Sequence, residues 1–294
     1  MKIQRFPELL PERVAQTRDA LHAYAKLIGQ WAESNRRRRK HWWHLSLRPS
    51  LCGLTTGVIH SNINFELELD FRGSALRVAH DNGMASVNLC GQSQRELAEF
   101  VHRQLELAGI EACAVPTFDE LDETPHPACS AQVARDMHVA LASVTATLEE
   151  FRATLLEETS PIQVWPHHFD LSMVWLPGAR IAGTDPADEE AAAKQMNFGF
   201  LFGDRNVSEP YLYVTAYPHF EALQATPLPA GAEWHSDGFQ GAVLRYKELA
   251  RSENPSAHLR ALWQPLLEAA RVPLSALRQS TFTDTRQLSR IFSR

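Results

Sequence analysis

Two histidines and an aspartate lie within four residues of one another at the start of a strand-like segment. They are His167, His168 and Asp170, in residues 164–175. Neutral imidazole and carboxylate groups are ligands for zinc, iron or manganese, and a bound metal with an open position can activate water. The same groups can transfer protons without a metal. The segment therefore indicates either a transition-metal site or an acid–base site.

A metal ion at this segment would need ligands from elsewhere in the chain. Adjacent residues on a strand point to opposite faces, so His167 and His168 are not expected to bind one ion together. The sequence contains no HExxH motif and no facial-triad spacing. A histidine hydrogen-bonded within a polar cluster is the commoner arrangement. We take His168 and His235 as candidate metal ligands; other donors that could complete the shell are His219, Glu233 and Asp237.

Acid–base chemistry is the second use of these residues. Asp170 could orient the imidazole of His168 or of His44, which lies in a similar segment at residues 41–47. A buried structural pair is the alternative, because such pairs also have shifted pKa values. Ser46 and Ser172 are poor nucleophile candidates because neither lies in a GxSxG motif. The nucleotide-binding patterns GxGxxG and GxxxxGK[ST] are also absent from the sequence.

The periodicity of apolar residues predicts the elements that would position these groups. In the first half it predicts a helix at residues 11–34, strands at 42–48, 63–71 and 84–90, and a second helix at 93–109. In the second half it predicts a helix around residues 137–155, strands at 168–175, 196–202 and 211–217, and helical segments at 242–251 and 256–271.

The repeated element order predicts an α+β fold with two pseudo-equivalent helix–strand–strand–strand–helix halves. Leu45-Ser46 would correspond to Leu171-Ser172, and Asn64-Phe65 to Asn197-Phe198. We expect the halves to share one antiparallel sheet with helices packed on one face, and to form one compact unit. The predicted divisions are a first half at 1–114, a linker at 115–130, a second half at 131–278 and a C-terminal tail at 279–294.

Alternation along the strands predicts one core face and one polar face. The polar face would carry ionisable, hydroxyl and tyrosine side chains, among them His44, Ser46, Arg48, Glu66, Glu68, Asp70, His168, Asp170, Ser172, Tyr211, Tyr213 and Tyr217. Such a face can simply meet water, which is normal for an antiparallel sheet. Aromatic residues beside ionisable groups are more typical of a lined pocket, so we favour a pocket.

Composition bounds the class of protein. The chain of 294 residues is 44% hydrophobic and 22% charged, which is ordinary for a globular protein. Its net charge of −6 argues against a general nucleic-acid binder. The sequence has no signal-peptide core and no apolar run long enough to span a bilayer. Its four cysteines form no CxxC pair. We therefore expect a cytoplasmic protein with reduced thiols. The basic run at residues 36–40 could contact phosphate groups, but a solvated loop is the simpler interpretation.

Several short motifs together resemble a bacterial family of unknown function, over nearly the whole chain. They are WWH at 42–44, GLTT at 53–56, FELELDF at 65–71, FDL at 169–171 and AYP at 216–218. The family has no established activity, so the resemblance implies no reaction. Where this chain has His167-His168, the family often has Gly-Ser, which moves the emphasis from the histidines to Asp170. The residues that match the family pattern, and that the resemblance therefore favours for a shared site, are His44, Thr55, Thr56, Asp170 and Tyr217.

These observations predict a small-molecule pocket on the polar sheet face, with possible acid–base or metal-assisted catalysis. The candidate catalytic residues are His44, Asp170 and Tyr217, and the candidate ligand-binding residues are Arg48, Thr55, Thr56, Glu66, Ser172 and Tyr213. The alternative is a non-catalytic module that receives a partner protein on the same face. A concavity of ligand size around Asp170 would favour the first, and a flat face with a large exposed apolar patch would favour the second.

Overall fold

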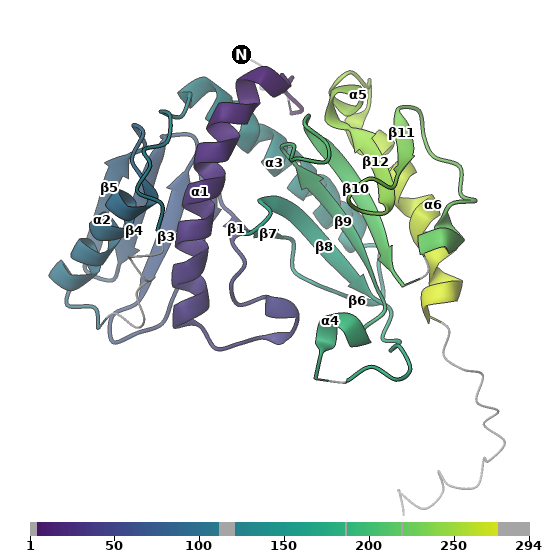
Figure 1. The fold of residues 1–294 in the computed structure, drawn as a ribbon, viewed down its shortest axis with the longest axis horizontal. Coiled ribbons are helices and arrows are strands. Elements are labelled where there is room, and N and C mark those ends of the chain that lie inside the picture. The colour runs from purple at the N-terminus through teal and green to yellow at the C-terminus, as the bar shows by residue number, and fades with distance from the viewer. Residues whose placement is uncertain (1–4, 112–120, 186, 219, 276–294) are drawn as a thin grey trace, which may run out of the picture.

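Two antiparallel sheets with helices packed against them make up the molecule (Figure 1). The computed structural model describes residues 5–111, 121–185, 187–218 and 220–275. The predictions made for residues 115–120 of the linker, for His219 and for the tail at 279–294 lie outside the described residues, as does Cys113, one of the four cysteines expected to be reduced. Within the described residues, no helix is both long enough and apolar enough to cross a membrane.

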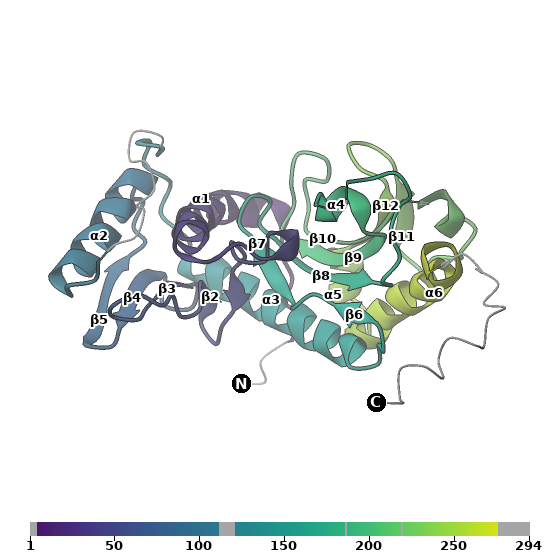
Figure 2. The ribbon, with the colours of Figure 1, turned by 90° about the horizontal axis from the view of Figure 1, so that it is seen from below.

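The first sheet has five strands in the order of the chain, β1-β2-β3-β4-β5. Helices α1 and α2 lie over one face of this sheet, and α1 contacts β3 while α2 contacts β4 (Figure 2). The bounds of its elements are α1 Pro11–Asn35, a 3-10 turn at Lys40–Trp42, β1 Arg48–Pro49, β2 Gly53–Thr55, β3 Phe65–Asp70, β4 Ala75–His80, β5 Gly83–Asn88 and α2 Gln94–Leu107.

The second sheet has seven strands. Six follow the order β11-β12-β10-β9-β8-β6, and β7 also pairs with β8. Helices α3, α5 and α6 lie on one side of this sheet and the short α4 lies on the other (Figure 2). The bounds are α3 Ala131–Arg152, β6 Glu158–Thr159, β7 Gln163–Trp165, β8 Asp170–Leu176, α4 Glu189–Ala192, β9 Gln195–Leu201, β10 Tyr211–Tyr217, a 3-10 turn at Phe220–Leu223, β11 Ala232–His235, β12 Gly241–Arg245, α5 Tyr246–Ala250 and α6 Pro255–Ser275.

The expectation of one shared sheet is wrong, and two prolines explain why. Among the described residues, the backbones of the two sheets are joined only at an isolated bridge, in which Leu47 and Val164 exchange hydrogen bonds of 2.9 Å and 2.8 Å. In an antiparallel ladder the next hydrogen-bonded positions lie two residues away on each strand. On this register they would be Pro49 in one direction and Pro166 in the other. Neither residue has an N–H to donate, so the ladder stops after one pair.

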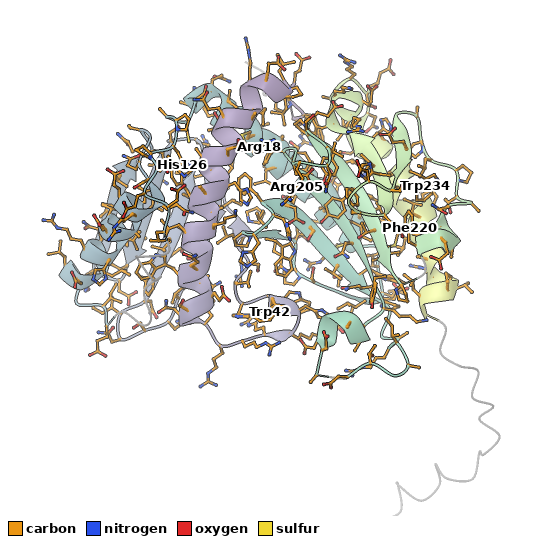
Figure 3. The ribbon with its side chains drawn as sticks, viewed as in Figure 1. Arg18, Trp42, His126, Arg205, Phe220 and Trp234 are labelled. Carbon is orange, nitrogen blue, oxygen red and sulfur yellow. The ribbon has the colours of Figure 1, made fainter. Side chains whose placement is uncertain are left out.

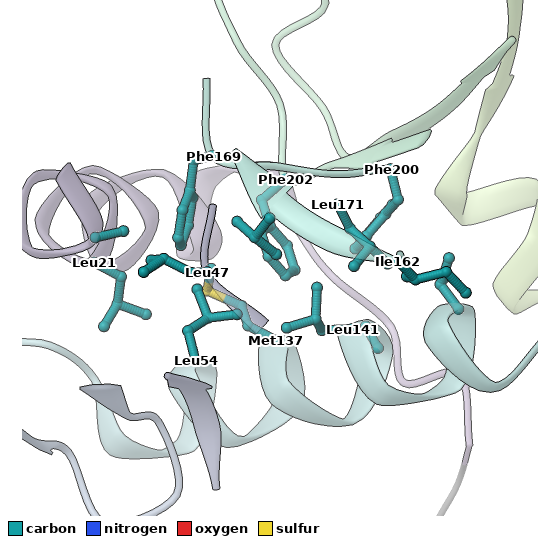
Figure 4. Close-up of a cluster of buried hydrophobic side chains, with 14 of the residues drawn as sticks. Leu21, Leu47, Leu54, Met137, Leu141, Ile162, Phe169, Leu171, Phe200 and Phe202 are labelled. Carbon is teal, nitrogen blue, oxygen red and sulfur yellow. The ribbon is translucent and has the colours of Figure 1, made fainter. Parts of the chain in front are cut away.

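The core lies between the helices and both sheets. Side chains from α1, the first sheet, α3 and the second sheet belong to one continuous cluster of buried apolar residues (Figure 4). The strand alternation predicted the core face correctly on three strands and their flanks, because Phe65, Leu67, Leu69, Phe71, Phe169, Leu171, Met173, Trp175, Met196, Phe198, Phe200 and Phe202 all belong to this cluster. Every residue of β8 is buried, so its polar face is covered as well.

The α+β class is confirmed, but two predicted elements differ from the structure. The segment 42–48 is not a strand: His41 and Trp42 have positive φ angles of 51° and 57°, and only Arg48 and Pro49 are extended in β1. The expected helix at 242–251 begins as β12 and becomes helical only at Tyr246. The strands β2, β4, β6, β7 and β11 were not predicted.

The structure does not confirm the internal duplication. Leu45-Ser46 lies in a turn, whereas Leu171-Ser172 lies in the middle of β8. The two sheets also differ in their number of strands and in strand order. The matching dipeptides therefore do not occupy equivalent positions.

Candidate functional site

A cavity of about 580 Å³ lies over the polar face of the second sheet. Its floor comes from β8, β9 and β10. Its walls come from the end of α1, from the loop that follows α1, and from the turn at Trp165–His168. Trp42, which lies in this loop, is labelled in Figure 3. The cavity is lined by Glu33, His41, Trp42, Leu45, Trp165, His167, His168, Asp170, Ser172, Val174, Gln195, Asn197 and Tyr213.

Asp170 and Tyr213 form the polar centre of this cavity. The Tyr213 hydroxyl donates a hydrogen bond of 2.6 Å to Oδ2 of Asp170. The other oxygen of the carboxyl, Oδ1, is buried and has no hydrogen-bond partner among the described residues. Asp170 is only 6% exposed. A buried acceptor without a partner is costly, so this oxygen is suited to receive a polar atom of a ligand.

A glycine on the strand between them lets Asp170 and Tyr213 meet. Gly199 on β9 pairs with Tyr213 on β10 and with Ser172 on β8. A Cβ atom on Gly199 would overlap the Tyr213 ring. The ring therefore lies across the bare backbone of β9, and its hydroxyl reaches the neighbouring strand.

Burial sets the protonation of this pair. It raises the pKa of the Asp170 carboxyl above its ordinary value, while the hydrogen bond from Tyr213 and the charge of His168 act in the opposite direction. Burial and the negative charge of Asp170 raise the pKa of Tyr213 well above 10. Tyr213 thus remains a hydrogen-bond donor at neutral pH, and Asp170 keeps its proton to a higher pH than an exposed aspartate does.

Ser172 and Trp165 form a second polar contact beside this pair. The indole Nε1 of Trp165 donates a hydrogen bond of 2.9 Å to the Ser172 hydroxyl oxygen, across the β7–β8 pair. This bond fixes the Trp165 ring against the cavity. Ser172 follows Asp170 by two residues on β8, so both side chains project from the same face of the sheet.

The turn that carries His167 and His168 separates the Asp170 cavity from a second one of about 750 Å³. Both histidines are exposed and line both cavities. The second cavity also has Arg18 of α1 and Arg205 of the loop after β9 in its lining, and both are labelled in Figure 3. The turn is held by His22, whose Nε2 donates to the carbonyl oxygens of His167 and Pro166 at 3.0 Å and 3.1 Å.

His22 is neutral at physiological pH. Its burial, and then the charge of Lys26, lower its pKa to about 4. The ring also stacks on Phe169, with a centroid distance of 5.3 Å. His22 thus has a structural role in positioning the turn that precedes Asp170.

The structure brings together only part of the predicted site. Asp170, Ser172, Tyr213 and His168 line one cavity. His44 and Arg48 line a different cavity of about 550 Å³, although the His44 ring stacks on Trp42 with a centroid distance of 5.8 Å. Tyr217 is 43% exposed and is not part of the Asp170 cavity lining. The shared site of His44, Asp170 and Tyr217 therefore does not form a single cluster.

The remaining predicted ligand-binding residues lie on the first sheet. The Thr55 hydroxyl donates to the carboxylate of Glu66, and it also accepts the backbone N–H of Gly57 at 2.7 Å. The Thr56 hydroxyl donates to the Gly57 carbonyl oxygen at 2.9 Å and accepts the N–H of Leu67 at 3.0 Å. These bonds hold the turn after β2, so both threonines have partners within the fold.

The candidate metal ligands are not brought together. His168 lies at the Asp170 cavity, whereas Nε2 of His235 donates to the backbone oxygen of Asp237 at 2.6 Å and its ring packs on Phe239. Within the part of the chain that the structure describes, no group of three or more His, Cys, Asp or Glu side chains could hold a metal ion. We derive no chemistry through a metal.

Sequence reasoning missed several residues of the cavity. Gln195 and Asn197 alternate with Met196 and Phe198 on β9, so the strand pattern already placed them on the polar face. Glu33 belongs to α1 and reaches the cavity through tertiary packing, for which the sequence offers no signal.

Comparison with known proteins identifies the family. The model of one protein family, described as a family of unknown function (DUF5996), matches residues 6–274. The chain therefore belongs to this family, which confirms the resemblance to a family without established activity. A search of the curated proteins and a search of the solved structures each found no match.

Proposed function

We propose that this member of the DUF5996 family binds a small polar organic molecule in the Asp170 cavity, and that Asp170 exchanges a proton with it. The observation that carries the proposal is the Asp170 carboxyl: the residue lines a cavity of ligand size, and its buried Oδ1 has no hydrogen-bond partner among the described residues. A polar atom of the ligand at this oxygen would complete the hydrogen bonding of the carboxyl. Ligand binding would thereby remove the cost of a buried acceptor.

The rest of the lining suits a small molecule with an apolar part. Trp42, Trp165 and Val174 offer apolar surface, and Gln195 and Asn197 offer amide groups that both donate and accept. Small-molecule sites typically combine an apolar wall with a few placed polar groups. The volume of about 580 Å³ lies within the range of such sites.

Acid–base chemistry follows from the environment of the carboxyl. A raised pKa lets Asp170 donate a proton to a ligand, or accept one, closer to neutral pH than an exposed aspartate can. The hydrogen bond from Tyr213 fixes the orientation of the carboxyl and leaves Oδ1 without a partner among the described residues. Asp170 is thus the catalytic residue of the proposal, and Tyr213 is a positioning residue.

The alternative, a module that receives a partner protein on this face, has less support. Large apolar side chains that are exposed come from separate elements of the fold: they are Trp42, Leu51, Val58, Met84, Leu107, Leu156, Tyr217 and Val272. Single exposed apolar residues are normal for a protein surface, whereas a docking face has a contiguous patch.

A thermal-shift screen tests the proposal. A defined library of small polar metabolites would be screened against the wild-type protein and Asp170→Asn. The control is Asp81→Asn, which removes an exposed carboxylate in the turn between β4 and β5. We expect compounds that stabilise the wild type and the control but not Asp170→Asn. Compounds that stabilise Asp170→Asn equally, or a library without any stabilising compound, would contradict the proposal.

Two further variants test the wider site that the sequence predicted. His44→Gln and Tyr217→Phe would be screened with the same compounds. Loss of the same stabilisation in either variant would extend the site to that residue. Retention of the stabilisation would limit the site to the residues of the Asp170 cavity.

A further inference from the structure

Four arginines converge on a separate cavity of about 550 Å³, here called the arginine cavity. They are Arg36, Arg37 and Arg39 from the basic run after α1, and Arg48 from β1. The same lining includes the imidazoles of His44 and His60 and contains no Asp or Glu. Such a concentration of positive charge is unusual in a chain whose net charge is −6.

Arg36 anchors one side of the arginine cavity. Its guanidinium donates to the backbone oxygen of Gly57 at 3.0 Å, to that of His44 at 3.4 Å and also to that of Thr56. These bonds connect the loop after α1 with the turn after β2. The side chain is therefore held in place before any ligand arrives, which lowers the entropic cost of binding.

A second guanidinium lies beside the first. Nitrogens of Arg36 and Arg48 lie 3.5 Å and 3.7 Å from the position that a Cβ atom would take on Gly57. Gly57 has a φ of +66°, and the absence of a side chain there leaves the space between the two guanidinium groups open. Arg48 can offer its N–H donors to an anion in this space, and Arg36, whose Nη2 is bound to backbone carbonyl oxygens, adds its positive charge.

The positive charges in this cavity are not balanced by the protein. Among the described residues, no carboxylate forms an ion pair with any of the four arginines. Glu66 is the carboxylate whose charge acts on Arg36, and it also accepts the hydroxyl of Thr55. The charge of Glu33 acts on His44 in the same lining. Two such carboxylates do not neutralise four guanidinium groups, so the cavity favours an added anion.

We propose that the arginine cavity binds a small anion with at least two phosphate groups, such as a phosphorylated metabolite. Arginine matches phosphate oxygens with paired N–H donors, and four arginines require more than one negative charge. A concave site of this volume suits a small molecule better than a polymer. The acidic chain as a whole would also repel a long polyanion. This ligand is separate from that of the Asp170 cavity.

Inorganic pyrophosphate is the probe that tests the proposal. Its binding to the full chain would be measured by isothermal titration calorimetry for the wild type, Arg39→Gln, Arg48→Gln and Arg38→Gln. Arg38 is the matched control, because it belongs to the same basic run but lies over the Trp42 ring, at 4.6 Å from its centroid, and is not part of the cavity lining. Thermal unfolding without pyrophosphate would show that each variant folds.

We expect Arg39→Gln and Arg48→Gln each to weaken pyrophosphate binding by about tenfold or more, and Arg38→Gln to weaken it much less. Added salt should weaken binding of the wild type. An equal loss in Arg38→Gln would overturn the proposal in favour of general attraction to a basic surface. Absence of pyrophosphate binding would also overturn it, as would binding only of a short RNA or of vesicles with anionic lipid.

Discussion

Asp170 combines features that rarely occur together in a residue with a purely structural role. Its carboxyl is buried, one oxygen accepts the Tyr213 hydroxyl, and the other has no partner in the described structure. A structural aspartate normally has both oxygens satisfied, as Asp204 shows: one oxygen accepts two backbone N–H groups and the other accepts the Tyr211 hydroxyl. The contrast between these two Asp–Tyr pairs separates a candidate site from a structural contact.

The raised pKa of Asp170 makes a prediction about stability. Its pKa in the unfolded chain is near 3.8 and its folded value is higher. Between pH 3.8 and the folded pKa, the folded state therefore binds more protons than the unfolded state. The stability that this group contributes is fully present below pH 3.8 and is lost as the pH rises through the folded pKa. Asp170→Asn should accordingly gain free energy of unfolding relative to the wild type as the pH rises from about 4 to about 8.

Urea unfolding of both proteins at several pH values measures this difference. Asp81→Asn, at an exposed position, is the control for the loss of a carboxylate. A difference between Asp170→Asn and the wild type that stays constant with pH would mean that burial does not raise the pKa of Asp170.

Gly199 makes a second prediction at a single position. Alanine there would overlap the Tyr213 ring and push its hydroxyl away from Asp170. We expect Gly199→Ala to lower the free energy of unfolding by about 1–3 kcal/mol, as overpacking does. In a Tyr213→Ala background the same substitution should cost much less, because the overlapping ring is gone. Urea unfolding of the four proteins measures the coupling, and equal costs in both backgrounds would contradict the proposed contact.

Helix α1 positions the turn before Asp170 through one close approach. The Cβ position of Gly29 lies 2.5 Å from Cγ of Pro166, so the helix and the turn meet where α1 has no side chain. Alanine in a helix is favoured over glycine by about 1 kcal/mol, but overpacking costs about 1–3 kcal/mol. We therefore expect Gly29→Ala to lower the free energy of unfolding, which urea unfolding measures. We also expect it to change the fluorescence emission of Trp165. Gln30→Ala, at an exposed position of the same helix, should be neutral or stabilising; equal stability of the two variants would contradict this interpretation.

Sequence patterns predicted those strands whose two faces differ. On β8, Leu171, Met173 and Trp175 alternate with Asp170 and Ser172, so period two indicated both the strand and its polar face. The segment 42–48 has a similar alternation, yet positive φ angles at His41 and Trp42 turn the chain before a strand can form. The alternation of apolar and polar side chains does not show whether a neighbouring strand is available for backbone hydrogen bonds.

The contacts between elements could not be predicted for the same reason. The Asp170–Tyr213 bond depends on the strand order β10-β9-β8 and on the glycine between them. The assignment of His44 to the Asp170 site relied on a sequence echo, but the structure places His44 at the arginine cavity. Residues on neighbouring strands are brought together by register, which one sequence does not reveal.

The whole molecule has one core, although its two sheets are separate. Met137 of α3 lies among side chains of both halves, with Leu54 of the first sheet and Leu171 of the second in the same cluster (Figure 4). The backbone connection between the sheets is a single bridge at Leu47 and Val164. Apolar packing therefore carries most of the coupling between the halves, because a hydrogen-bonded pair contributes only about 0.5–1.5 kcal/mol.

This shared core predicts that the two sheets unfold together. Native-state hydrogen exchange would compare the slowest backbone amides of β3 and β4 with those of β9 and β10. We expect the same free energy of opening in both groups. Met137→Ala should lower both by an equal amount, about 2–5 kcal/mol, because the cavity that it leaves is shared. If Met137→Ala lowered protection in one sheet alone, or if one sheet opened at a much lower free energy, the halves would be independent folding units that merely touch.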